Sequence, residues 1–526
     1  MHLPTCIGHS VIFSIVDIRA KDLRHSSSTS PSITQETWHS FASPKVSTLI
    51  HIPSISLSPL TKAHVTGVET FQERSTYMLA VLKDPSLRLV LALSDRVDET
   101  LLYHQLHWLI AIGKLPTDSA SRFQLLRVPT TGGQPLAEAI LASPAAFSQL
   151  RSVVSRGRAL LDFWAAGTAE NHLANLLECR HTGQPKTVAG SDSKATAKAI
   201  FKAAKVQTPD DFGCISTIQD LFRLYHDRYP DLKARGFRNL MIKLNREEGG
   251  TGIARLASDG IYRSETALRQ ALHFDTKTVS LCEFESAMRG SGALVECEVS
   301  GRNLRSPSGT LLISANGHVE LLATHDQIVD GCAYTGCRFP ADIRYRHNVA
   351  AQSLLVAREC ARRGWRGPVS VDFVVDVSIN TEEQPELYAI EINARKTATF
   401  HPFLWTKFLT DSRLDPRRGE LIRHGMKSVY EAREHVAVAS QFARGPKEVI
   451  RMLQHSGLLF DATTNTGMIP HHLAGVRATG KIGVTAVART HEHSAALLAA
   501  CQNALRTTGS GGPRSTSRSF KKTAAR

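Results

Sequence analysis

Two stretches of sequence decide the fold: SVDFVVD at 370–376 and LYAIEINAR at 387–395. Each is apolar enough for a buried β-strand, and the residues between them are polar enough for a loop, which predicts a hairpin. Alternate side chains of a strand share one face, so Glu391, Asn393 and Arg395 are expected to point the same way. Asp372 lies on the preceding strand, and the hairpin brings it beside them.

This set of side chains favours binding of a metal ion and a phosphate. Two carboxylates, an amide oxygen and a guanidinium on neighbouring strands suit hard cations that bridge phosphate oxygens. The alternative is an exposed polar face of an antiparallel sheet, and the two strands alone leave both interpretations open.

Composition sets the broad class of protein. The chain has 526 residues, 42% of them hydrophobic, which is enough for two or three domains. No apolar run approaches the ~20 residues that span a bilayer, and the apolar run at 11–16 is too short for a signal peptide. The nine cysteines have no metal-binding or disulfide spacing, which predicts a reduced, cytoplasmic location.

The formal charge of +15 is unevenly placed along the chain. Six of these positive charges lie in the acid-free segment 506–526. The rest are spread thinly along the chain and do not alternate with aromatic residues. Nucleic acid is therefore a weak hypothesis. A few placed lysines would serve a polyanionic small molecule such as a nucleotide equally well.

Patterning along the chain predicts five segments. Residues 1–68 are rich in Ser, Thr and Pro and are expected to form a flexible extension. Residues 69–190 alternate strands and helices, which predicts a doubly wound parallel α/β domain, and they lack a dinucleotide-binding glycine fingerprint. Residues 191–410 and 411–505 are predicted as α+β, and 506–526 as a basic disordered tail.

A lysine and a glycine-rich turn mark the central segment. Lys243 lies in an apolar strand, where a buried ammonium group needs an anion. The glycines that follow, Gly249, Gly250 and Gly252, let backbone N–H groups approach phosphate oxygens. An edge strand followed by an ordinary glycine turn explains the same pattern.

Further charged pairs flank that turn in the sequence. Lys194 and Lys198 lie one helical turn apart and can face one cleft. Glu296 and Glu298 share one face of a strand that could border an adenine pocket. For both pairs, a solvated face is the alternative.

The order of these elements resembles that of the ATP-grasp superfamily over residues 190–405. More locally, the chain is similar to the branch that contains pheganomycin-type peptide ligases and IQ-motif-protein-like ATP-grasp proteins. The motifs that carry this resemblance are SPS at 306–308, THDQ at 324–327, GCRFP at 336–340, RK at 395–396, HP at 401–402, NTG at 465–467 and GKIGVT at 480–485.

The resemblance implies a fold of mixed α/β and α+β domains. A pre-ATP-grasp domain would precede a two-subdomain ATP-grasp fold and a C-terminal α+β extension. It also implies that Lys198 and Lys243 contact ATP phosphates, that Gly249–Gly252 close over the triphosphate and that Glu296 lies at the adenine end. Asp372, Glu391 and Asn393 would hold Mg²⁺, and Arg395 would stabilise the transferred phosphoryl group.

The implied activity is that of an ATP-dependent carboxylate–amine ligase that works through an acyl phosphate. Its substrates would be a small carboxylate and an amine, such as amino acids or peptides, with no membrane partner; homo-oligomerisation stays open. The alternative is an ATP-binding regulatory or scaffold protein without ligase activity.

Two regions near the expected substrate site leave its detail open. Thr397, Ala398 and Phe400 stand where relatives commonly have a Gly-Gly pair and a threonine. Four histidines could contact a substrate or be ordinary hydrogen-bonded histidines: His325, His401, His471 and His472.

Overall fold

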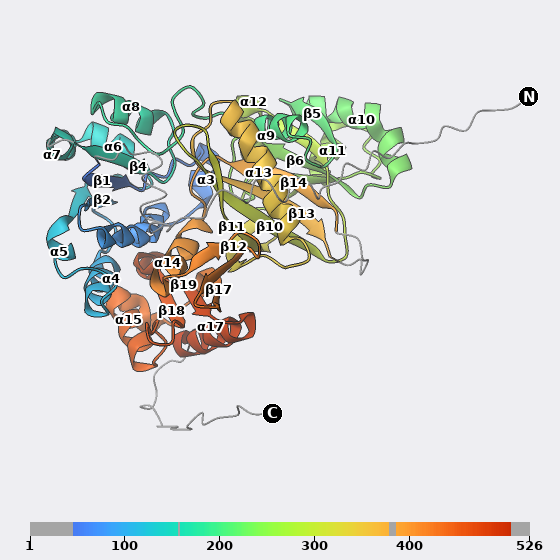
Figure 1. Ribbon diagram of the computed structural model, residues 1–526. Helices are drawn as coiled ribbons and strands as arrows, with labels where there is room; N and C mark the ends of the chain where they lie inside the picture. Colours follow the sequence, from blue (N-terminus) through green and yellow to red (C-terminus); the bar gives the residue numbers. More distant parts are fainter. Residues whose placement is uncertain (1–45, 156–157, 378–384, 507–526) are drawn as a thin grey trace, which may run out of the picture.

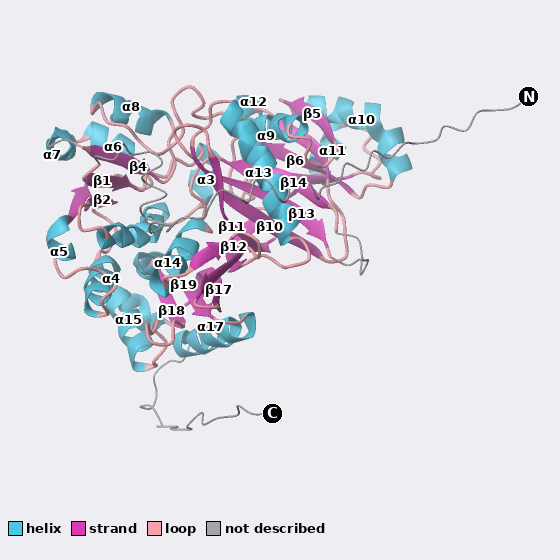
Figure 2. Cartoon of the chain, viewed as in Figure 1, coloured by secondary structure: helices cyan, strands magenta, loops and turns pink. Residues whose placement is uncertain are grey.

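The computed structural model describes residues 46–155, 158–377 and 385–506. Three β-sheets organise these residues: a 4-stranded parallel sheet, a 5-stranded sheet and a 10-stranded sheet. In Figure 1 the parallel sheet lies on the left, the 5-stranded sheet at the upper right, and the 10-stranded sheet runs from the centre to the lower part. Most of the helices lie around the outside of these sheets (Figure 2).

The N-terminal domain is built on the parallel sheet, whose order is β3-β2-β1-β4. Its strands are β1 (Thr48–Ile52), β2 (Arg88–Ser94), β3 (Phe123–Val128) and β4 (Ala159–Phe163). Its helical segments are the 3₁₀ segment η1 (Val68–Lys83), α4 (Thr100–Ala111), α5 (Ser119–Arg122), α6 (Leu136–Ala142), α7 (Pro144–Ser155) and α8 (Thr168–Leu176). The predicted doubly wound parallel domain is therefore confirmed.

The predicted flexible extension over 1–68 is wrong for residues 46–68. Strand β1 lies between β2 and β4, and all five of its residues are buried. Helix α3 (Pro59–His64) follows it. The surrounding Ser/Pro-rich composition hides this five-residue buried strand, because composition averages over a longer window than one strand occupies. Residues 1–45 lie outside the described residues.

The 5-stranded sheet has the order β5-β9-β6-β7-β8. Its strands are β5 (Asp211–Ile215), β6 (Asn239–Leu244), β7 (Ile253–Ala257), β8 (His273–Phe274) and β9 (Ala293–Cys297). The accompanying helices are α9 (Lys194–Ala203), α10 (Ile218–Arg235), α11 (Glu265–Ala271) and α12 (Leu281–Ser291). Hydroxyl side chains set where several of these helices begin: Ser280 and Glu283 form a capping box on α12.

The 10-stranded sheet begins with the order β14-β13-β10-β11-β12-β17. These strands are β10 (Leu304–Ile313), β11 (Val319–Asp330), β12 (Ala333–Phe339), β13 (Gly367–Asp376), β14 (Leu387–Asn393) and β17 (Met426–Ala437). Helices α13 (Arg346–Arg362) and α14 (Phe400–Thr410) accompany them. Strands β10 and β11 form a hairpin whose turn contains the dipeptide Asn316-Gly317, with Gly317 at a φ of +86°.

The C-terminal part continues this sheet. It adds β15 (Arg413–Asp415), β16 (Glu420–Arg423), β18 (Gly467–His471) and β19 (Lys481–Ala488). Its helical segments are η2 (Ser440–Arg444), α15 (Pro446–His455), η3 (Leu473–Gly475), α16 (Val476–Thr479) and α17 (His491–Arg506). Because β17 pairs with both β12 and β19, the C-terminal segment shares its sheet with the preceding segment.

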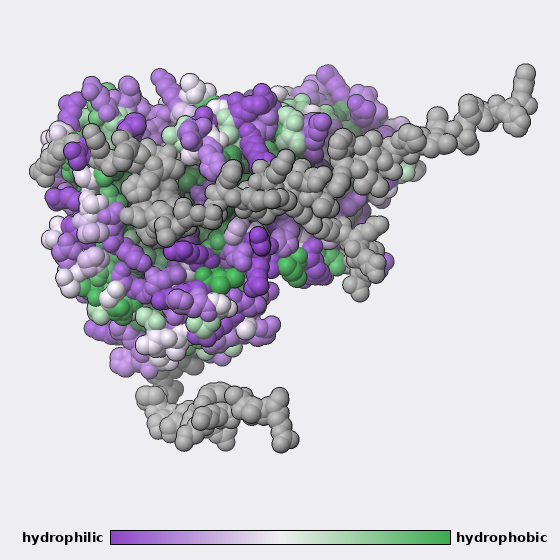
Figure 3. Space-filling model, viewed as in Figure 1, coloured by the Kyte–Doolittle hydropathy of each residue, from purple (hydrophilic) through white to green (hydrophobic). Residues whose placement is uncertain are grey.

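An apolar core joins the N-terminal domain to the C-terminal part. One cluster of buried residues includes Leu91 of β2, Met78 of η1, Trp405 of α14 and Tyr430 of β17. A large apolar interface of this kind fixes the relative position of two domains. The face drawn in Figure 3 is mainly hydrophilic, with apolar areas separated from one another.

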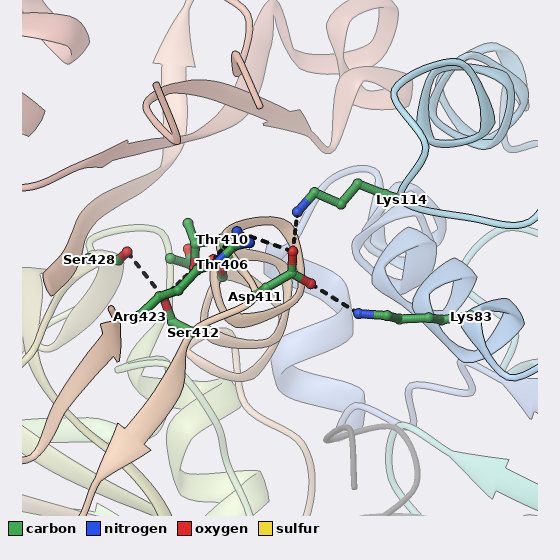
Figure 4. A network of polar contacts seen from close by, with 8 residues as sticks. All are labelled: Lys83, Lys114, Thr406, Thr410, Asp411, Ser412, Arg423 and Ser428. Carbon is green, nitrogen blue, oxygen red and sulfur yellow. Dashed lines mark hydrogen bonds and ion pairs between the residues drawn. The ribbon is translucent and has the colours of Figure 1, made fainter. Parts of the chain in front are cut away.

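A polar network strengthens the same junction at its edge (Figure 4). Asp411, which follows α14, accepts hydrogen bonds from Lys83 at 2.9 Å, Lys114 at 2.5 Å and Arg423 at 3.3 Å. Burial opposes ionisation of the Asp411 carboxyl, but Lys114 and Lys83 hold its pKa below the usual value.

Candidate active site

The deciding stretches form the predicted antiparallel pair, β13 and β14. Asp372 lies opposite Glu391 and Ser370 opposite Asn393, which confirms the hairpin; most of its loop, 378–384, is outside the described residues. The Asn393 amide donates to Asp372 Oδ2 at 3.0 Å, and the Gln327 amide donates to Asp372 Oδ1 at 2.7 Å. Carboxylate and amide oxygens thus converge at one end of the strand pair.

The electrostatics of the two carboxyl groups differ. Burial, followed by the charge of Glu391, raises the pKa of Asp372 to about 7. Burial also opposes ionisation of Glu391, but Lys194 and then Arg395 outweigh it and lower that pKa. Two facing carboxylates that repel each other offer a place for a cation, because a cation between them removes the repulsion.

Three lysines lie on the neighbouring helix α9 and strand β6. Lys194, at the start of α9, lies 3.3 Å from Glu391 Oε1 and donates to the Glu247 carbonyl at 2.8 Å. Lys198 lies 3.0 Å from Glu296, which also forms an ion pair with Lys243. The structure therefore brings Lys198, Lys243 and Glu296 together.

The two lysines bonded to Glu296 respond differently to burial. Burial dominates for Lys198 and lowers the pKa of its ammonium group. For Lys243 burial acts in the same direction, but the charges of Glu296 and Glu391 outweigh it and raise the pKa. Lys243 is buried, with 7% of its surface exposed, so its charge depends on the acids around it.

The glycine-rich turn connects β6 to β7 beside these lysines. Gly249 and Gly250 adopt positive φ values of 64° and 85°, which other residues rarely adopt. A Cβ at Gly250 would lie 3.4 Å from the Cys332 backbone, so the turn approaches the β11–β12 connection of the large sheet. At Gly252 the Glu247 side chain fills the space where a Cβ would lie.

The N-terminal segment holds this turn in place. Glu247 accepts hydrogen bonds from the Thr61 amide at 3.2 Å, the Thr61 hydroxyl at 3.0 Å and the Ser58 hydroxyl. The Ser58 amide donates to Glu248 at 3.4 Å. Helix α3, which the sequence placed in a flexible extension, thus contacts the turn expected to cover the phosphates.

The residues after β14 connect the site to the N-terminal domain. Arg395 is half-buried, and its charge acts on Asp372, Glu391 and Glu248. Lys396 is fully buried and turns to the N-terminal sheet, where it lies 2.5 Å from Asp162 Oδ2. The His51 ring lies 2.5 Å from the same oxygen, at the carboxyl ends of β1 and β4.

The site contains residues whose role the sequence did not reveal. Gln327 belongs to the THDQ motif, but the motif alone indicates no role for it. Glu247 stands close to Lys243 in the sequence, and nothing in that position predicts a contact with α3. Asp162 and His51 show no local signal, because Asp162 lies 111 residues from His51 and 234 residues from Lys396 in the sequence. The departures at 397–400 are structural in part: Phe400 is buried, and its ring centroid lies 6.2 Å from that of Tyr77.

The four histidines singled out in the sequence are all buried. His325 bonds to the Tyr430 hydroxyl at 2.7 Å, and His472 bonds to Thr70 at 2.6 Å. Those two are ordinary hydrogen-bonded histidines, as the alternative interpretation predicted. His401 and His471 share Glu434 as a neighbour.

The donor set fits a nucleotide with a divalent cation. Carboxylate and amide oxygens are the ligands that Mg²⁺ prefers, and it is usually held by one or two carboxylates together with substrate phosphates. The lysines and the glycine turn supply positive charge and backbone N–H groups on the facing sheet. This arrangement defines the class: an ATP-grasp fold with its ligand side chains between two sheets.

Comparisons with known proteins agree with this class. Residues 279–417 match the family described as "IQCH-like, ATP-grasp", and residues 448–498 match the "PGM1 C-terminal domain". Over these residues the chain is therefore similar to the ATP-grasp branch that its sequence motifs resemble.

Two curated relatives are similar in sequence to most of this chain. An L-propargylglycine--L-glutamate ligase of Streptantibioticus cattleyicolor is 27% identical over 431 residues, which cover 80% of this chain and 86% of that protein. The IQ motif-containing protein H of Danio rerio is 21% identical over 399 residues, which cover 66% of this chain and 37% of that protein. The second relative is thus matched over well under half of its length.

Among solved structures, the biotin carboxylase of Campylobacter jejuni has the same fold. The TM-score is 0.51 at 12% identity, covering 86% of this chain and 89% of that chain.

Among the helices of the described residues, none has the length and apolar character that a membrane span requires.

Proposed function

We propose that this chain is an ATP-dependent carboxylate–amine ligase that forms peptide bonds through an acyl phosphate. One observation carries the proposal: Asp372, Glu391 and Asn393 converge at the end of β13 and β14, where Lys194 of α9 forms an ion pair with Glu391 and the charge of Lys243 in β6 acts on the same carboxylate. Phosphoryl transfer needs positioning and charge neutralisation above all, and this arrangement supplies both.

Each predicted residue has a defined task in this proposal. Lys198 and Lys243 contact ATP phosphates, and Gly249, Gly250 and Gly252 form the turn that covers them. Glu296 borders the adenine end. Asp372, Glu391 and Asn393 hold Mg²⁺, which supplies charge neutralisation for the triphosphate when bound. Arg395 stabilises the charge of the phosphoryl group during its transfer.

The reaction proceeds in two steps. An oxygen of the substrate carboxylate attacks the γ-phosphorus, and the bond to the β-phosphate oxygen breaks, giving an acyl phosphate and ADP. The substrate amine then attacks the acyl carbon, loses a proton and displaces inorganic phosphate, which leaves an amide. Lys396, buried against Asp162, acts on the first step indirectly, because it fixes the chain immediately after Arg395.

The relatives suggest where to look for substrates and where the enzyme works. The name of the Streptantibioticus relative describes a ligase for two amino acids, one of them L-glutamate. Amino acids and short peptides are therefore the substrate class that we propose. The eight cysteines of the described residues are free, which supports a location in the reducing cytoplasm.

The scaffold alternative is less favoured. The altered residues at 397–400 are the main support for it, yet Phe400 lies in the apolar core and Thr399 is buried beside Thr310. Buried positions such as these do not remove a group from the phosphate site. The similarity to a ligase over most of the chain also favours an active enzyme.

A phosphate-release screen tests the proposal. The full chain is incubated with ATP, Mg²⁺ and pairs drawn from amino acids and dipeptides, and phosphate and new amides are measured together. We expect phosphate release that requires both members of a pair and equals the amide formed. Binding of ATP without phosphate release across the whole panel would overturn the ligase and favour the scaffold.

A further inference from the structure

A second group of ligand-type side chains lies away from β13 and β14. His401 is near the start of α14, Glu434 is in β17 and His471 ends β18. One candidate ligand atom from each residue lies within 4.8 Å of the other two. His401 Nε2 is 3.1 Å from Glu434 Oε1, and His471 Nδ1 is 3.9 Å from Glu434 Oε2.

The imidazoles of this group have nitrogen atoms without hydrogen-bond partners. Among the described residues, His401 Nδ1 and both ring nitrogens of His471 are buried and unpaired. The two side chains are no more than 1% exposed. Buried polar atoms are almost always hydrogen-bonded, and an unpaired one calls for an explanation such as an ion.

The fold makes room for His471 in a specific way. Gly483 of β19 lies opposite His471 in the strand pairing, and a Cβ there would collide with His471 Nδ1 and the adjoining ring carbon. Only a glycine therefore lets the imidazole lie against β19 and face Glu434. A strand glycine often marks the close approach of another group.

The charge states suit metal ligands. Burial lowers the pKa of both His401 and His471, so both rings are neutral and each keeps a lone pair. Burial opposes the ionisation of Glu434, but the charge of Arg74 is the main influence that holds its pKa well below the usual range. Arg74 binds only Oε2, at 3.1 Å, which leaves Oε1 on the side of His401.

We propose that His401, Glu434 and His471 bind one divalent transition-metal ion, with zinc as the expected metal. Imidazole nitrogen and carboxylate oxygen bind Zn²⁺ at about 2.0–2.2 Å, and a tetrahedral ion with three protein ligands keeps a fourth position for water. Arg74 would orient the carboxylate, as hydrogen-bond partners of metal ligands commonly do.

The ion has a structural role in this proposal. It joins the start of α14 to β17 and β18, three elements that are distant in the sequence. Helix α14 follows the loop that begins after Arg395, so the ion also fixes the far end of that loop. The proposal does not depend on the ligase activity, because its ligands are not those assigned to Mg²⁺.

The metal content of the full chain tests this proposal. The protein is purified without a histidine tag or chelator, unfolded in guanidinium chloride, and its metals are measured by mass spectrometry and by a zinc-sensitive dye. We expect about one zinc ion per chain, as for a site with three protein ligands. Metal at the buffer background, also after incubation with zinc and desalting, would overturn the proposal.

Substitutions assign the metal to this group. We expect His401→Ala and His471→Ala to lose the ion, whereas His325→Ala, which removes another buried histidine, keeps it. If His471→Ala keeps the zinc content of the wild-type protein, the ion binds elsewhere and the proposed site is wrong.

If the variants fail to fold, cobalt substitution in the wild-type protein tests the proposal instead. Replacement by Co²⁺ should give the visible absorption bands of a tetrahedral ion with nitrogen and oxygen ligands. Absence of these bands in a folded, cobalt-treated protein would overturn the proposal.

Discussion

Two groups of ligand-type side chains accompany the large sheet, and they offer different atoms. Asp372, Glu391 and Asn393 present oxygen atoms and are half-buried. His401 and His471 present nitrogen atoms beside Glu434, and all three are buried. Oxygen ligands suit an ion that is shared with a nucleotide and leaves with it, whereas a buried site with imidazoles suits an ion that stays.

The charges around the two groups also differ, in a way that fits one ion that leaves and one that stays. Asp372 faces Glu391, so one carboxylate is partly uncompensated until a cation arrives. Glu434 already has Arg74 as its partner, and its two other neighbours are neutral imidazoles. The comparison predicts that damage to the first group removes activity and damage to the second removes stability.

The largest expected effect is that of Glu391→Gln on catalysis. Removing one group that stabilises the transferred charge should lower Mg²⁺-dependent ATP turnover by about 100- to 1000-fold, or about 2.7–4 kcal/mol. Steady-state kinetics measure the effect, and thermal unfolding checks that the variant is folded. Glu386→Gln, an exposed change near the start of the same strand, is the matched control. Wild-type turnover in folded Glu391→Gln would break the comparison.

The largest expected effect on stability is that of Glu434→Ala. The change leaves Arg74 and His401 without their buried partner, and breaking a buried ion pair costs about 3–5 kcal/mol. Urea unfolding measures the loss, with Glu391→Gln as the reference for a carboxylate outside the closed group. Equal stabilities of these two variants would show that the two groups do not differ in kind.

A third prediction concerns the pH dependence of stability and the carboxyl group of Glu73, which precedes Arg74 in the sequence. Burial raises the pKa of Glu73 to about 8 from an ordinary value of 4.5, so the folded protein holds a proton that the unfolded chain releases. The stability that this proton contributes is complete below pH 4.5 and is lost as the pH rises through about 8. We expect Glu73→Gln to flatten this decline in urea unfolding measured at several pH values. A decline of the same slope in both proteins would contradict the assignment.

The smallest effect is expected for Lys83→Met at the exposed junction of Figure 4. Asp411 keeps Lys114 and Arg423, and its carboxylate is partly exposed. Surface ion pairs contribute about 0–1 kcal/mol, so the free energy of unfolding should fall by no more than that. A loss as large as that of Glu434→Ala would mean that exposure does not separate these networks.

Much of the fold follows from local sequence patterns. The strand pair 370–376 and 387–395 and the turn at Asn316-Gly317 are predictable, because side-chain alternation and turn chemistry act over a few residues. Strand β1 was missed because it is only five residues long, three of them apolar, and stands within a Ser/Pro-rich region. The sheet shared between β12 and β17 needs pairing over about a hundred residues, which no local pattern encodes.

The site was predictable where residues stand in an order along the chain. Lys198, Lys243, Glu296 and the acidic strand pair could be selected in this way, although their roles toward ATP stay predictions. Contacts between distant segments could not be selected: Thr61 with Glu247, Asp162 with Lys396, and Glu434 with His471. Each of these depends on how whole domains pack against one another.

The fate of an oxygen atom tests the central claim most directly. A pair of substrates found in the phosphate screen is supplied with the carboxylate labelled with ¹⁸O, and the released phosphate is analysed by mass spectrometry. Attack of the carboxylate on the γ-phosphorus predicts one labelled oxygen in every phosphate that accompanies an amide. Unlabelled phosphate formed together with the amide would contradict the acyl phosphate and the ligase mechanism built on it.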